Sequence, residues 1–206
     1  MEETTGKQHS LWAILSALLI GTLIGTMGNS MVSIALPSFR ESFGVSLSTA
    51  VWSITLYTLT FSVLIPVFGS LGTSIGYKRM FVSGMALVIA GSVMCILAPS
   101  FFLFLMARIA IGVGVATILP TIMGIITHFF PPYSQGQATG AWAFVNSLGH
   151  AIGPSLGGLL LGFFSWHSIF WVNIPLALAA ITLALKVLPE DRPTTSVKLF
   201  DWPGAA

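Results

Sequence analysis

Arg108 is the only charged residue between Arg79 and Lys186, and it stands in the apolar segment RIAIGVGVATILP, residues 108–120. A guanidinium in the hydrocarbon core of a membrane costs about 2.5 kcal/mol or more, so an ionisable residue there marks a functional site by default. The alternative is snorkelling to the interface, which a distance of roughly 10 Å to the helix end permits. We favour a functional charge.

A pattern of small residues occupies GHAIGPSLGG, residues 149–158. Gly149, Gly153 and Gly157 recur at every fourth position, so on a helix they share one face and allow a second helix to approach closely. Pro154 removes a backbone donor from the same segment and kinks or loosens the helix. Taken alone, these residues favour an ordinary helix contact.

The composition requires lipid around these segments. Hydrophobic residues make up 55% of the chain and charged residues 7%, whereas soluble domains carry roughly 25% charged residues. The net charge of +2 is spread out, which argues against nucleic-acid binding. The histidines lack metal-ligand spacing, and there is no paired carboxylate, serine–histidine dyad or cofactor loop. We therefore predict no enzyme activity, metal or cofactor.

The apolar runs predict an all-α transmembrane protein, because about 20 apolar residues cross the hydrocarbon core as a helix. Six spans are expected, near residues 11–36, 50–72, 80–98, 101–127, 138–162 and 168–188. Residues 1–10 then form a cytoplasmic N-terminus and residues 189–206 a cytoplasmic linker. We choose this orientation because basic residues favour the cytoplasmic side, and it leaves only Arg40 on the outer side. The basic residues that it places inside are Lys7, Lys78, Arg79, Lys186, Arg192 and Lys198.

A faint internal repeat divides the six spans into two sets of three. IALPS (34–38) is similar to TILPT (117–121), and the segment 69–81 can be aligned with 158–170. Both offsets are close to three spans. The pattern indicates a three-plus-three arrangement of helices.

The glycine segment resembles a motif of drug:proton antiporters of the major facilitator superfamily, which it matches at Gly149, Gly153, Pro154, Gly157 and Gly158. The resemblance implies that these residues pack helices and gate a transport path. Arg108, Gly112 and Gly114 are similar to the superfamily motif in the fourth helix, which is implicated in proton coupling.

The connection between the second and third spans resembles the superfamily's cytoplasmic loop motif at Gly69, Gly76, Lys78 and Arg79. Thr73 stands where the family has the aspartate of its cytoplasmic latch.

The first span also departs from the family, because Gly28 replaces a membrane aspartate. An aspartate there could have paired with Arg108. Without it, Arg108 must rely on carbonyls, water, Asn29, Ser33 or a carboxylate of another polypeptide.

Polar and aromatic residues of the spans could line a substrate path, or could equally serve as interface anchors or packing residues. The candidates are Asn29, Trp52, Tyr57, Trp142 and Asn146.

The resemblance covers nearly the whole chain and implies the N-terminal six-helix half of a proton-coupled multidrug-efflux transporter of the 14-helix branch, inactive alone. Its expected partners are the bilayer, lipophilic small molecules including cations, protons, and a missing C-terminal half or a second copy. We expect a multi-pass protein of the cell membrane with both termini cytoplasmic. The alternatives are a non-transporting assembly partner or truncated gene product, and a transporter of sugars or metabolites.

Overall fold

The computed structural model of the chain describes residues 2–188, so the predicted linker lies outside the described part. Every regular element in this part is a helix. The elements are α1 (Glu2–Ile34), α2 (Leu36–Phe43), α3 (Leu47–Ile75), α4 (Tyr77–Ile96), α5 (Phe101–Ala116), α6 (Ile118–Phe129), α7 (Pro132–Phe163) and α8 (His167–Val187). The predicted all-helical class is confirmed.

Five segments of the described chain are long and apolar enough to cross a membrane. They are Leu11–Ile34, Leu47–Gly72, Tyr77–Ile96, Phe101–Phe129 and His167–Val187, the fourth of which joins α5 and α6. The remaining predicted span is α7. At 32 residues it is long enough to cross a membrane, but its glycine, serine, asparagine and histidine residues lower its mean hydropathy.

The connections are shorter than the sequence indicates. The segment 69–79, expected as a loop, is helical apart from Gly76, which joins α3 to α4 with a φ of 95°. Only glycine adopts this φ readily, so Gly76 permits the reversal in a single residue. The connection between the spans expected at 101–127 and 138–162 is likewise confined to residues 130–131, because Pro132 begins α7 and proline suits the first helical position.

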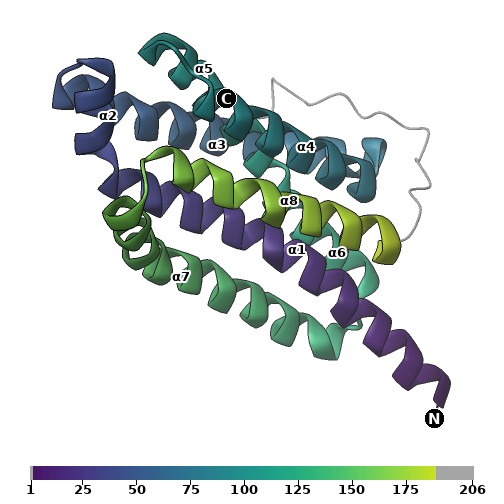
Figure 1. Cartoon of the computed structure of the whole chain (residues 1–206). Coiled ribbons are helices and arrows are strands. Elements are labelled where there is room, and N and C mark those ends of the chain that lie inside the picture. Colours follow the sequence, from purple (N-terminus) through teal and green to yellow (C-terminus); the bar gives the residue numbers. More distant parts are fainter. Residues whose placement is uncertain (1, 189–206) are drawn as a thin grey trace.

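The helix packing follows the expected repeat. Five contacts dominate the bundle: α1 with α7, α3 with α5, α4 with α5, α4 with α8, and α1 with α8. The first repeat consists of α1, α3 and α4, and the second consists of α5 (with α6), α7 and α8, so that α1 corresponds to α5, α3 to α7 and α4 to α8. Under this correspondence the α1–α7 contact becomes the α5–α3 contact, and the α4–α5 contact becomes the α8–α1 contact. The α4–α8 contact maps onto itself. Figure 1 shows α1 between α7 and α8, at the centre of this arrangement.

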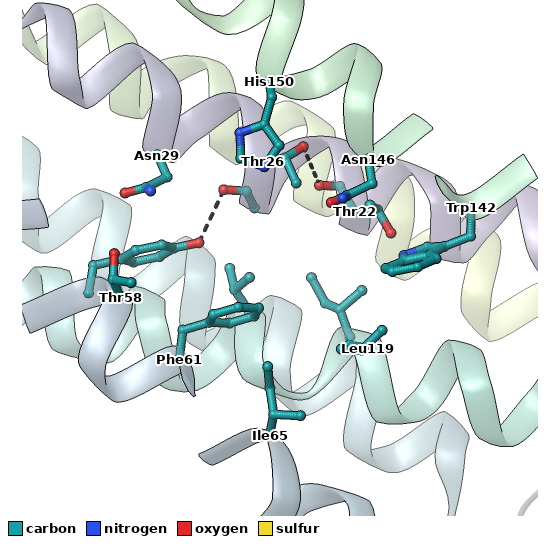
Figure 2. Close-up of a pocket in the computed structure, with 14 residues that line it drawn as sticks. Thr22, Thr26, Asn29, Thr58, Phe61, Ile65, Leu119, Trp142, Asn146 and His150 are labelled. Carbon is teal, nitrogen blue, oxygen red and sulfur yellow. Dashed lines mark hydrogen bonds between the residues drawn. The ribbon is translucent and has the colours of Figure 1, made fainter. Parts of the chain in front are cut away.

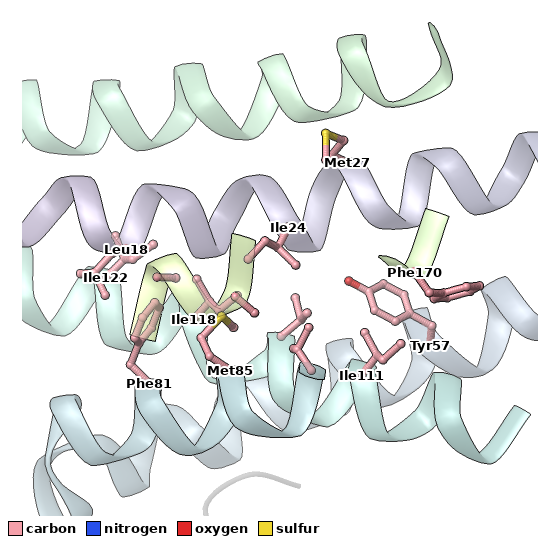
Figure 3. Packing of buried hydrophobic residues seen from close by; sticks show 14 of the residues in the cluster. Leu18, Ile24, Met27, Tyr57, Phe81, Met85, Ile111, Ile118, Ile122 and Phe170 are labelled. Atoms are coloured by element: carbon pink, nitrogen blue, oxygen red, sulfur yellow. The ribbon is translucent and has the colours of Figure 1, made fainter. Parts of the chain in front are cut away.

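The core lies between α1, α4, α6 and α8, where apolar side chains from different helices interdigitate (Figure 3). Leu18, Phe81, Met85 and Ile122 are each 0% exposed. Lipid tails are as apolar as these side chains, so moving the side chains out of lipid gives no hydrophobic gain. Association of the helices therefore depends on close packing.

An aromatic cluster closes the end of the bundle that carries α2. The ring centroids of Phe39 and Phe104 lie 4.8 Å apart, and Trp166 packs edge-on against Phe39 at 5.3 Å. The Trp166 indole Nε1 donates a hydrogen bond to the Ser42 hydroxyl at 2.8 Å. These contacts fix α2 against the segment that leads into α8.

Candidate functional site

Arg108 lies at the centre of the bundle and is 2% exposed. Its Nε donates to the Ser53 carbonyl oxygen at 3.0 Å, and its Nη2 donates to Asn29 Oδ1 at 3.1 Å. The guanidinium carbon also lies 4.5 Å from the centroid of the Tyr57 ring, a favourable position for a cation over an aromatic face. The charge is therefore held by a carbonyl, an amide and a ring, and snorkelling to the interface is wrong.

Tyr57 links this arginine to α1. Its hydroxyl donates to the Gly25 carbonyl oxygen at 3.1 Å while its ring underlies Arg108. Gly25 makes room for α5, since a Cβ there would lie 2.6 Å from Val115 Cγ1, whereas its 3.8 Å distance to the Tyr57 hydroxyl would be an ordinary contact. One arginine thus ties α5 to both α1 and α3.

A cavity of about 370 Å³ lies beside this network, lined by α1, α3, α5, α6 and α7. Figure 2 shows polar side chains of α1 and α7 facing Phe61, Ile65 and Leu119. The polar and aromatic lining residues are Thr22, Thr26, Asn29, Tyr57, Thr58, Phe61, Trp142, Asn146 and His150, and the others are Gly25, Ile65, Val115, Ile118 and Leu119. Its volume falls within the usual range for small-molecule sites.

Four of the five residues predicted for a substrate path line this one cavity: Asn29, Tyr57, Trp142 and Asn146. The fifth, Trp52, is 53% exposed and does not line this cavity, so its place in a substrate path stays a prediction. His150 is one of the lining residues that the sequence interpretation missed. Trp142, Asn146 and His150 follow one another at intervals of four residues, which places all three on one face of α7 and could have revealed His150.

Asn29 and Tyr57 belong both to the cavity lining and to the arginine network. A solute or proton that changes the hydrogen bonding of Asn29 in the cavity therefore alters an acceptor of the buried guanidinium. Binding of a solute in the cavity can thus affect the Arg108 guanidinium through Asn29.

Gly28 does not face Arg108, contrary to the pairing considered from the sequence. A Cβ at this position would lie 3.4 Å from Oδ1 and 3.6 Å from Nδ2 of Asn173. Asn173 is 3% exposed, and its Nδ2 donates a long hydrogen bond of 3.5 Å to Ser92 Oγ. It is the next residue, Asn29, that binds Arg108.

Three glycines of the α7 motif form the expected close helix contact. A Cβ at Gly149 would overlap the Thr26 hydroxyl, one at Gly153 would lie 2.6 Å from Ser30 Cβ, and one at Gly157 would lie 3.1 Å from Met31 Cα. All three contacts are with α1. Gly158 is different, because no atom lies within 4 Å of its Cβ position. Its assignment to the packing face is therefore wrong.

Pro154 stands within this contact segment, and α7 nevertheless continues through it from Pro132 to Phe163. Proline has no backbone N–H, so the carbonyl four residues earlier loses its helical donor. The expected effect on the helix is a local loosening and not an end.

The two glycines near Arg108 also permit close helix approach. A Cβ at Gly112 would lie 3.0 Å from the Tyr57 carbonyl oxygen of α3, and one at Gly114 would overlap the Gly84 carbonyl oxygen of α4. These glycines allow α5 to pack closely between its two neighbours.

The cytoplasmic motif residues have separate surroundings. Lys78 Nζ donates to the carbonyl oxygens of Leu185 and Leu188, each at 3.1 Å, and so caps the C-terminal end of α8. Arg79 is exposed, and no atom lies within 4 Å of a Cβ at Gly69. Lys78 therefore connects α4 to α8.

This bundle of membrane-length helices, with a mainly apolar cavity between them, is a multi-pass helical membrane protein. Residues 18–203 match the Major Facilitator Superfamily, and the chain belongs to it. This is a family of transporters and not of enzymes.

Named relatives include transporters of more than one solute. The chain is 32% identical over 193 residues to the Riboflavin transporter RibZ of Clostridioides difficile, a match covering 94% of this chain and 42% of RibZ. It is 32% identical over 190 residues to the Multidrug efflux pump LfrA of Mycolicibacterium smegmatis, covering 92% and 38%. The chain thus spans less than half the length of these relatives.

The crystal structure of the human organic anion transporter MFSD10 (TETRAN) shares the fold, with a TM-score of 0.75 at 17% identity. The match covers 93% of this chain and 51% of that one.

We predict that Gly157→Leu lowers the stability of the protein in detergent micelles by about 1–3 kcal/mol, because Met31 leaves no room for a larger side chain. Gly158→Leu is the matched control, since it adds the same side chain to the next, open position. The measurement is the melting temperature of both variants. Equal melting temperatures would contradict the close contact between α1 and α7.

A second prediction concerns the hydrogen bond between Asn29 and Arg108. Asn29→Leu should destabilise the fold by about 1–3 kcal/mol, because it leaves a buried charged donor unpaired. In the double variant with Arg108→Met, the loss should be smaller than the sum of the single losses.

Asn146→Leu serves as the control, since Asn146 makes no hydrogen bond within the described part of the chain. Additive losses in the Asn29 and Arg108 pair would show that the bond contributes nothing.

Proposed function

We propose that this chain is the N-terminal six-helix half of a proton-coupled efflux transporter of the 14-helix branch. The observation that carries the proposal is the cavity, where Asn29, Tyr57, Trp142 and Asn146 meet beside the buried Arg108. The family membership supports transport, and the named relatives, which include a Multidrug efflux pump, support efflux of small organic molecules.

Proton coupling is supported by the position of Arg108. The chain has one acidic residue between positions 11 and 188, and this is the exposed Glu41 of α2. No carboxylate of these helices neutralises the guanidinium. We infer that the titrating carboxylate of the proton cycle comes from the other half of the transporter, with Arg108 as the fixed charge that responds to it.

A second half is expected to cover the faces of α3 and α7 that border the cavity. Only 6% of the span Leu47–Gly72 is buried within the chain, against 61% of Phe101–Phe129. Both α3 and α7 contribute residues to the lining of the cavity. Superfamily transporters bind substrate between two six-helix halves that rock against each other. A second copy of the chain is the alternative occupant of this face.

The proposed location is the cell membrane, with both termini on the cytoplasmic side. Lys78 binds carbonyls at the end of α8, so Lys78, Arg79 and Lys186 gather at one end of the bundle. Arg40 lies on α2. Basic residues favour the cytoplasmic side, which supports this orientation.

Two other functions compete with this one. A non-transporting assembly partner would have the same bundle but no substrate, and a sugar or metabolite transporter would differ in its solute. The aromatic residues Tyr57, Phe61 and Trp142 in the cavity favour aromatic organic solutes over sugars.

In the complete transporter reconstituted in liposomes, Arg108→Ala should reduce riboflavin transport driven by a proton gradient at least tenfold. Arg108→Lys should reduce it less, since lysine keeps the charge but loses the planar set of donors. Exchange of riboflavin without a gradient should persist in both variants, which separates coupling from binding.

Arg40→Ala is the control, because it removes an arginine of the same protein that is exposed. Normal gradient-driven transport by Arg108→Ala would refute the coupling role.

The 206-residue chain alone should insert into liposomes but should not transport. Without a second half, its polar cavity residues face lipid, which is costly, and no opposing half can alternate the access. Insertion is measured by protease protection and uptake with lipophilic dyes under a proton gradient. Gradient-driven uptake by this chain would overturn the assignment as half of a transporter.

A further inference from the structure

The charges around the cavity limit the kind of solute that it can bind. The residues that line it include threonines, asparagines, aromatic residues and one histidine, and none is acidic. Glu41, the sole acidic residue between positions 11 and 188, lies on α2 and does not line the cavity. The nearest full charge identified in the site is that of Arg108, which is bound to Asn29 of the lining.

The electrostatic consequence follows from the low dielectric of the surroundings. While the proposed carboxylate of the other half is protonated, no carboxylate neutralises this buried charge, and the charge produces a positive potential over a longer range than it would in water. This side of the cavity therefore repels a cation and attracts an electron-rich group.

Three hydrogen-bond donors remain available in the lining, beside acceptors such as the threonine hydroxyls and Asn146 Oδ1. Asn29 uses Oδ1 to accept from Arg108, which leaves its amide Nδ2 for a ligand. Asn146 and Trp142 make no hydrogen bond within residues 2–188, so an amide NH₂ and an indole N–H also remain. Such donors suit carbonyl, carboxylate or ring-nitrogen acceptors.

His150 extends this polar wall. The Ser30 hydroxyl donates to the Thr26 carbonyl oxygen at 2.9 Å, so towards His150 Nδ1, 3.1 Å away, it can only accept. Nδ1 therefore carries the hydrogen, and Nε2 is left as an acceptor in the neutral ring or as a donor in the charged one. Neither state supplies a negative charge.

Aromatic rings form other parts of the cavity lining. The rings of Tyr57 and Phe61 are parallel within 3°, with centroids 6.3 Å apart. Figure 2 shows Trp142 on the other side of the cavity from Phe61. Planar aromatic solutes can make offset or edge contacts with such rings.

We propose that this cavity selects planar aromatic solutes that are uncharged or anionic and carry hydrogen-bond acceptors, and that it disfavours lipophilic cations. The proposal rests on the proposed transport function and narrows its substrate class. It differs from the class that the antiporter resemblance implies, which includes cations.

The test uses three fluorescent probes and the complete transporter purified in detergent micelles, without any gradient. Fluorescein is an anion, riboflavin is uncharged, and rhodamine 123 is a cation with the same xanthene ring as fluorescein. Fluorescence anisotropy gives the Kd of each. We expect fluorescein and riboflavin to bind at least tenfold more tightly than rhodamine 123.

Asn146→Asp places a carboxylate in the cavity and should shift the ratio of the fluorescein and rhodamine 123 Kd values at least tenfold towards the cation. Thr58→Asp places a carboxylate in the same cavity from α3 and should shift the ratio in the same direction. This second variant provides the test if Asn146→Asp does not fold. Ser48→Asp is the control, because it adds an equal charge at the exposed start of α3, outside the cavity, and should leave the ratio unchanged.

Tighter binding of rhodamine 123 by the unchanged protein would overturn the proposal and leave the transport function standing. An unchanged ratio in folded cavity variants would also overturn it, since the probes would then bind elsewhere. If none of the three probes binds, the cavity is not a site for aromatic solutes, and the proposed efflux function fails with it.

Discussion

The guanidinium of Arg108 needs hydrogen-bond acceptors inside a bundle that offers it no carboxylate between positions 11 and 188 except the distant Glu41 of α2. Its acceptors are the Ser53 carbonyl of α3 and the Asn29 amide of α1, with the Tyr57 ring below. An uncompensated charge in lipid is costly, so α5 is stable only where α1 and α3 supply these groups. The relative placement of three helices follows from one side chain.

Close approach of those helices depends on the absence of side chains at a few positions. Gly25 of α1 admits Val115 of α5, while Gly112 lets α5 approach the Tyr57 carbonyl of α3. The α7 glycines do the same for α1. Because lipid tails offer no hydrophobic gain for helix association, shape fit at small residues takes on that role. The contacts repeat between the two three-helix sets, so one packing solution occurs twice in the chain.

Much of this structure could be predicted from the sequence, and the exceptions share a physical cause. Apolar runs and proline positions located the helices, and the four-residue glycine period predicted a close helix contact on α7, although not that its partner is α1. What the sequence could not specify at Gly158, Trp52 and Gly28 is which way a residue faces. The rotation of a helix about its axis is decided by its neighbours, and an apolar helix in lipid has no polar face to reveal it. The loop expected at 69–79 is absent, because Gly76 alone allows the chain to reverse between α3 and α4.

The composition of α7 reflects two demands on one helix. The side that packs against α1 needs Gly149, Gly153 and Gly157, and the side that lines the cavity carries Trp142, Asn146 and His150. Neither set contributes much apolar character, so the helix as a whole is less hydrophobic than the other five spans. Its place in the membrane then depends on its contact with α1, and a substitution that breaks this contact also moves one wall of the cavity. Helix packing and solute binding are therefore linked through α7.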